Sequence, residues 1–155
     1  MNLPSVIIGI ILSALAVGIG AIYYGDAFTD GAASATAATL ASQGGQISDA
    51  VDTFRAQNAG QEPADMTALI DGNYLESIPS VAISGTNEWN LSTVNGEDNK
   101  PTLALEGDAS TVCEEAQNAA GHDTPATFAT DTSSVGNELY GCAGADNSNL
   151  TFYRQ

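Results

Sequence analysis

Two cysteines, Cys113 and Cys142, are the side chains of this 155-residue chain best suited to covalent chemistry. No CxxC pair, third cysteine or histidine partner accompanies them, which argues against a zinc or redox centre. A disulfide between them would close a segment of about 30 residues and contribute about 3 to 4 kcal/mol in the chain-entropy model. It would also require an oxidising compartment. The sequence therefore predicts a bridge, and two buried free thiols are the alternative.

Other reactive side chains lack the context of a site. His122 stands beside Asp123 without a recognisable nucleophile, which is typical of a surface loop. Two runs of oxygen-bearing side chains lack EF-hand spacing and are interpreted as solvated turns: Glu97, Asp98 and Asn99, and Asp146, Asn147 and Asn149. We therefore predict no enzyme activity, no catalytic residue, no metal site and no cofactor. Asn90-Leu91-Ser92 and Asn149-Leu150-Thr151 match the glycosylation sequon, so Asn90 and Asn149 are candidate glycosylation sites.

The charge of the chain is strongly acidic. Nineteen carboxylates face only Arg55, Lys100 and Arg154, which gives a formal net charge of −16. A single subunit would repel a phosphate backbone, so we expect no direct nucleic-acid binding. The charge instead suits an exterior in salty or extracellular surroundings.

The beginning of the chain has the opposite character. Leu3 to Tyr24 carries no charged side chain, and as a helix it would reach roughly 33 Å, enough to cross the hydrocarbon core of a bilayer. A secretory signal fits poorly, because no Lys or Arg precedes Arg55 and Gly25-Asp26-Ala27 is a poor cleavage pattern. The segment is therefore predicted to be a transmembrane helix.

The helical pattern continues past the apolar run. Apolar or small residues recur at intervals of three and four and predict one buried stripe: Ala37, Leu40, Gly44, Ile47, Val51 and Phe54. We expect one long helix from near Pro4 to about Asn58, apolar in its first half and amphipathic in its second, with Asn58 and Gly60 as its stop. Glycines between Gly18 and Gly31 predict bending or unwinding there. Residues 1–30 are thus one unit and residues 31–155 a globular head.

Shorter elements occur in the head. We predict a helix from Pro63 to Leu69 closed by Gly72, and a helix from Ser110 to Ala120 capped by Asp108 or Ser110, with Thr111 and Glu114 at capping-box spacing and Gly121 as its end. His122 to Asn137 is expected to be a polar loop. Predicted strands are Val81–Ser84, Glu88–Val94, Thr102–Leu105, Leu139–Cys142 and Leu150–Arg154, with Asn95-Gly96 as a hairpin turn. The predicted fold class is α+β, a long helix packed on a small antiparallel sheet.

The order of these segments resembles a mature type IV pilin over nearly the whole chain. The resemblance is carried by the apolar start at Met1, by Phe54-Arg55-Ala56-Gln57-Asn58-Ala59-Gly60 and by Gly72-Asn73-Tyr74-Leu75. It is also carried by Val112-Cys113-Glu114-Glu115-Ala116-Gln117-Asn118, Leu139-Tyr140-Gly141-Cys142 and Phe152-Tyr153-Arg154, which resemble the disulfide-closed C-terminal region of pilins.

The resemblance implies a structural subunit of an extracellular filament, a pilus or fimbrium. In that family, a prepilin peptidase removes a basic leader and the new N-terminal amine is commonly methylated; the resemblance places this amine on Met1. Assembly machinery of such systems then moves the subunit from the inner membrane into a helical homo-oligomer on the cell surface. The residues implied in assembly are Met1, Pro4, Ser5, Val6, Ile7, Ile11, Leu12 and Leu15. Ser5 replaces the usual glutamate, which raises the chance of a minor or specialised subunit. Adhesion and motility would be properties of the fibre.

Two alternatives stay open at this point. Within the same class, the chain could be a minor pilin or a pseudopilin of a secretion system. From another class, it could be a membrane-anchored periplasmic binding domain that never polymerises, with the loop from His122 to Asn137 as its ligand surface. Fibres on cells would favour the filament subunit, and monomers in detergent would favour the binding domain.

Overall fold

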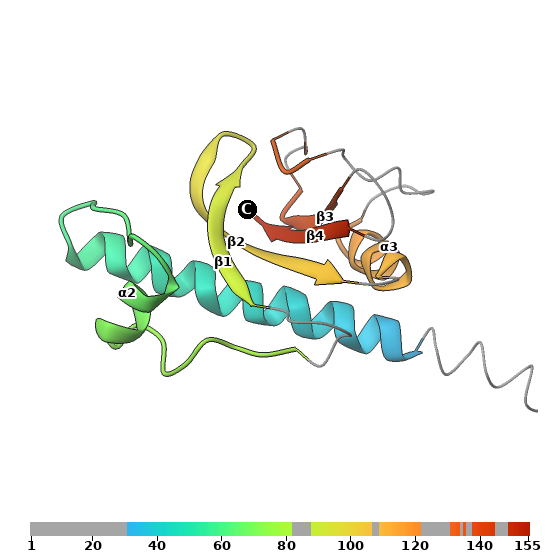
Figure 1. Ribbon diagram of the computed structural model, residues 1–155, viewed down its shortest axis with the longest axis horizontal. Coiled ribbons are helices and arrows are strands. Elements are labelled where there is room, and N and C mark those ends of the chain that lie inside the picture. Colours follow the sequence, from blue (N-terminus) through green and yellow to red (C-terminus); the bar gives the residue numbers. More distant parts are fainter. Residues whose placement is uncertain are drawn as a thin grey trace, which may run out of the picture. The chain divides into compact units, whose positions relative to one another are not determined.

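A computed structural model describes residues 31–81, 88–106, 109–121, 131–133, 135, 138–144 and 149–155 (Figure 1). Residues 34–155 form one compact unit. The predicted transmembrane segment lies outside the described residues. Among the residues that are described, no helix is both long and apolar enough to span a bilayer.

A long helix runs through residues 31–57 and lies along one face of the sheet (Figure 1). The predicted stripe is confirmed: Ala37, Leu40, Gly44, Ile47 and Val51 are buried and Phe54 is half-buried. The predicted stop is also confirmed. The Asn58 amide N–H donates to the Phe54 carbonyl at 2.9 Å. Ala59 and Gly60 follow with φ values of 55° and 82°, and glycine adopts such a value without strain.

Helix α2 spans Met66–Asp71 and ends, as predicted, at Gly72. Its predicted start at Pro63 is wrong by three residues. The Asp65 carboxylate accepts a hydrogen bond from the Ala68 N–H at 3.0 Å and so caps the helix. Pro63 is buried ahead of the cap.

Four strands form one antiparallel sheet in the order β1-β2-β4-β3: β1 is Trp89–Val94, β2 is Glu97–Glu106, β3 is Tyr140–Ala143 and β4 is Asn149–Arg154. The Asn95-Gly96 turn is confirmed, with φ values of 51° and 78° that suit a two-residue hairpin. Val81 is not in a strand, and most of the predicted strand at 81–84 lies outside the described residues.

Strand β2 begins five residues earlier than predicted. Pro101 lies inside it opposite Leu91 of β1, but the pairing with β4 starts only at Thr102. Proline lacks an N–H and cannot donate to a second strand. It is tolerated at position 101 because β2 has only one neighbouring strand there.

Helix α3 spans Ser110–Ala119 and is followed by Gly121 with a φ of 86°, which confirms its predicted end. Of its predicted caps, Asp108 lies outside the described residues and Ser110 is wrong. The N-cap is Ala109, whose side chain accepts no hydrogen bond, and Ser110 and Thr111 already lie inside the helix. Thr111 and Glu114 therefore cannot form a capping box, which needs the hydroxyl residue at the N-cap.

The core lies between the long helix and the sheet. Its largest side chains are Trp89 and Phe152, which meet edge to face with ring centroids 5.9 Å apart. Successive side chains of a strand point to opposite faces, and Tyr153 accordingly belongs to a second cluster with Val94, Val135 and Ala143. The α+β class is confirmed, as a helix on a four-stranded antiparallel sheet.

Candidate functional site

The residues that were predicted to drive assembly lie outside the described part of the chain: Met1, Pro4, Ser5, Val6, Ile7, Ile11, Leu12 and Leu15. Most of the loop from His122 to Asn137 does so as well. Of the two sequon asparagines, Asn90 is an exposed residue of β1, and Asn149 is the first residue of β4. The described candidate surface is therefore that of the head, within residues 34–155.

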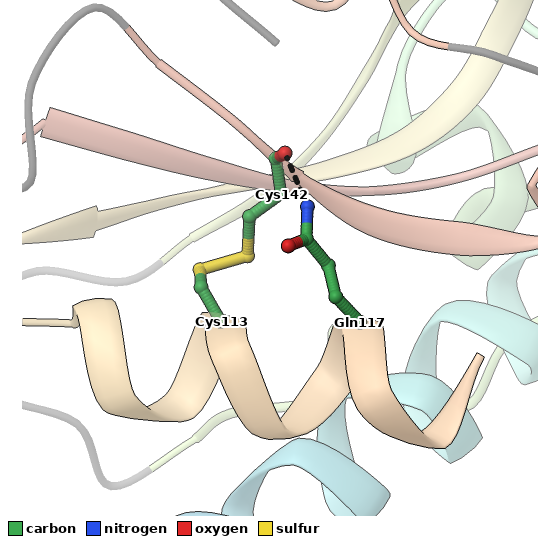
Figure 2. Close-up of a disulfide and its surroundings, with 3 residues drawn as sticks. All are labelled: Cys113, Gln117 and Cys142. Carbon is green, nitrogen blue, oxygen red and sulfur yellow. Dashed lines mark hydrogen bonds between the residues drawn. A yellow bond between two sulfur atoms is a disulfide. The ribbon is translucent and has the colours of Figure 1, made fainter. Parts of the chain in front are cut away.

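The disulfide between Cys113 and Cys142 is present and joins α3 to β3, with the two Cα atoms 5.6 Å apart. Both cysteines are buried. Gln117, one helical turn after Cys113, lies on the same face of α3 and its Nε2 donates to the Cys142 carbonyl at 3.4 Å (Figure 2). Strand β3 is thus linked covalently to α3, which packs in the core.

The segment between the two cysteines also contacts both edges of the sheet. At β3, the Gln117 amide donates a hydrogen bond to the Cys142 carbonyl. At β1, the Asn95 N–H donates to the Thr132 carbonyl at 2.9 Å, and the Thr132 hydroxyl donates to the Thr93 carbonyl at 3.2 Å. Unpaired edge groups invite pairing with another chain. These contacts therefore protect part of each edge, and the sequence carried no signal for them.

The long helix meets the sheet closely at Gly44 and Gly45. A Cβ on Gly44 would lie 3.3 Å from Cη2 of Trp89 and 3.4 Å from Cβ of Arg154. The Arg154 guanidinium crosses the helix, and its Nη1 donates to the Ala41 carbonyl at 3.2 Å. Because Gly44 has no side chain, the indole of Trp89 and the Cβ of Arg154 can pack directly against the helix backbone.

A polar chain fixes the same contact from the other side. The Trp89 Nε1–H donates to Oε1 of Gln43 at 3.1 Å, and Gln43 Nε2 donates to the Ser80 carbonyl at 3.1 Å. Gln43 thus satisfies the indole N–H of a buried side chain and ties the segment after α2 to the helix. The sequence pattern did not reveal this role of Gln43.

The other two basic residues line an open hollow of about 360 Å³ with Glu62, Glu97 and Asp98. Arg55 Nε contacts Oε1 of Glu62 at 2.8 Å, and Lys100 Nζ contacts Oε2 of Glu97 at 2.8 Å. The hydrogen bond and charge of Lys100 lower the pKa of the Glu97 carboxyl. All three strong bases of the chain are consequently engaged within the subunit.

The run Glu97, Asp98 and Asn99, which was weighed as a cation site, is divided among different partners. Glu97 binds Lys100, Asp98 accepts from the Thr93 hydroxyl at 2.6 Å, and the Asn99 amide donates to Glu62 at 3.4 Å. Within the described ranges, no group of three metal-binding side chains occurs. This hairpin end is held together by its own side chains.

Among the described titratable side chains, Tyr153 has the pKa that its surroundings shift most. Tyr153 is only 2% exposed and belongs to the second cluster, with Val94, Val135 and Ala143. Burial, with a smaller contribution from the Glu138 carboxylate, raises the pKa of Tyr153 to about 12. The phenol of Tyr153 is therefore neutral at physiological pH, and it packs on the sheet face that lies opposite the long helix.

Comparisons with models of known families, with curated proteins and with solved structures find no match to this chain. The described contacts stabilise the head in three ways: a helix packs on the sheet, a disulfide joins α3 to β3, and the edges of the sheet are partly covered. Such an arrangement can present a rigid surface and keep the helix at residues 31–57 packed on the sheet.

Proposed function

We propose that this chain is the structural subunit of a type IV pilus-like extracellular filament. Its apolar N-terminal helix anchors it in a membrane and then packs with copies of itself, while the head forms the outer wall. Each apolar helix would exchange lipid for other helices, so that apolar surface stays dry in both states.

The observation that carries the proposal is the long helix at residues 31–57. One stripe of it is buried in the head core, and only residues 25–30 separate it from the uncharged run that ends at Tyr24. In this proposal the helix continues into the uncharged run. Its second half would then pack in the head, and its first half would enter lipid or a bundle of helices. The disulfide supports an oxidising compartment outside the cytoplasm.

The test is fibre formation by cells that make the chain. Sheared surface material is imaged, and the N-terminus of the subunit is identified by mass spectrometry, which tests leader removal and methylation together. We expect fibres built of this chain with a modified Met1. Single anchored copies in detergent and no fibres would overturn the proposal.

Substitutions in the apolar segment test the mechanism. Val6→Asp or Ile11→Lys should abolish fibres, because each places an unpaired charge in a dry helix bundle. Val6→Ile, which keeps the position apolar, is the matched control and should give normal fibres. Normal fibre yield from both charged variants would contradict the assembly mechanism. Counting subunits per fibre separates a major subunit from a minor pilin or pseudopilin.

A further inference from the structure

We propose that Asn90 is a modification site that carries an N-linked glycan, and that the second sequon, at Asn149, is not modified in the folded subunit. Both asparagines satisfy the N-x-S/T pattern. The structure places them differently, and that difference carries the inference.

Asn90 lies in β1, which is an edge strand of the described sheet (Figure 1). Trp89 is buried in the core and Leu91 packs against it, whereas Asn90 and Ser92 are exposed. Because side chains alternate along a strand, the acceptor amide and the hydroxyl of the sequon share the face opposite the long helix. Both groups that a glycosyltransferase must read are thus directed away from the core.

The acceptor amide and the hydroxyl of this sequon each make one side-chain hydrogen bond. Asn90 Nδ2 donates to the Glu88 carbonyl at 3.1 Å, an exposed contact with a residue two positions earlier in the chain. The Ser92 hydroxyl accepts from the Thr102 hydroxyl at 3.0 Å. An intramolecular hydrogen bond contributes about 1 kcal/mol net, so freeing these two side chains costs little. The backbone of this sequon pairs with one neighbouring strand only, β2.

Asn149 begins an interior strand. Strand β4 lies between β2 and β3, Asn149 pairs with Glu106, and the next residue, Leu150, is 1% exposed and pairs with Leu105. Bending this sequon into an active site would break the ladder with β2 and remove Leu150 from the core. The backbone of Asn149, Leu150 and Thr151 is therefore held in the sheet by its pairing with β2.

The reaction balances as a transfer from a lipid-diphosphate-linked oligosaccharide. Nδ2 of Asn90 attacks the anomeric carbon of the first sugar and forms the N–C bond. The bond between that carbon and the phosphate oxygen breaks, and the lipid diphosphate leaves with the electron pair. One amide proton passes to a base of the transferase, and no oxidation or reduction occurs.

The experiment uses the full chain isolated from the cells that produce it. After reduction of the disulfide, cleavage after glutamate yields residues 89–97 as one peptide, because Glu88 and Glu97 flank the first sequon, and residues 139–155 as another after Glu138. Mass spectrometry with fragmentation then reports carbohydrate on each peptide separately. Ser92→Val and Ser92→Thr form a matched pair of nearly equal size, of which only the threonine variant retains a sequon.

We expect carbohydrate on residues 89–97 in the wild type and in Ser92→Thr, its loss in Ser92→Val and Asn90→Gln, and none on residues 139–155. Recovery of residues 89–97 solely at the unmodified mass, or modification that persists in Ser92→Val, would overturn the assignment of Asn90. Carbohydrate at Asn149 would overturn the argument from strand position. Fibre formation is scored on the same samples, so a failure of the filament proposal is distinguished from a failure of this one.

Discussion

The clearest prediction for a single residue concerns the buried phenol of Tyr153. The pKa of Tyr153 is about 12 in the folded state and roughly 10 in the unfolded state. Below pH 10 its contribution to the free energy of unfolding is therefore constant. From there up to pH 12 the unfolded chain loses the proton and the folded one keeps it. The free energy of unfolding should therefore fall by about 2 to 3 kcal/mol across that range. Urea unfolding at each pH measures it. Tyr153→Phe should lack this loss, and an identical pH dependence in both proteins would contradict the prediction.

A second residue-level prediction concerns the close contact at Gly44. Gly44→Val should lower the free energy of unfolding by about 1 to 3 kcal/mol, because its side chain would be forced against Trp89 and Arg154. Gly45→Ala is the control in the same helical turn. A Cβ there would lie 3.4 Å from Cζ at the far end of the Arg154 side chain, and alanine favours the helix by roughly 0.5 to 1 kcal/mol. Equal effects of the two substitutions in urea unfolding would show that the contact is not tight.

Among the elements, the α3–β3 clamp should carry a large share of the stability. Replacing both Cys113 and Cys142 by alanine should lower the free energy of unfolding by about 3 to 4 kcal/mol, since the bridge spans a sequence separation of 29. Adding a reductant to the wild type should cause a similar loss and should not affect the double variant. A change below about 1 kcal/mol would mean that the packing of α3, not the bridge, holds this end of the sheet.

The elements also show what the sequence could and could not predict. The spacing of Leu40, Gly44 and Ile47 predicted the long helix and its buried face, because helix periodicity and core packing agree there. Strand β2 was predicted too short because its first residues are polar and form a strand only by pairing with β1. The insertion of β4 between β2 and β3, and the edge contacts of Gln117 and Thr132, are long-range pairings without a local signal. The residues proposed for assembly remain predictions.

Charge acts at the level of the whole subunit. The net charge is −16, and the three basic side chains contact groups of their own subunit. Neighbouring heads in a filament would thus bring acidic surfaces together. Screening of such exposed charges depends on salt, because the Debye length shrinks from about 30 Å at 0.01 M to about 8 Å at 0.15 M.

Under the proposed function, fibre yield should therefore rise with sodium chloride concentration, and isolated fibres should dissociate at low salt. Sedimentation of fibres between about 0.01 and 1 M sodium chloride measures both. Neutralising three exposed carboxylates with Asp49→Asn, Glu76→Gln and Glu114→Gln should shift the salt requirement downward, because it removes part of the repulsion and leaves the apolar helix unchanged. This variant separates charge screening from a general effect of salt on apolar contacts. If its salt dependence equals that of the wild type, repulsion between heads does not control assembly.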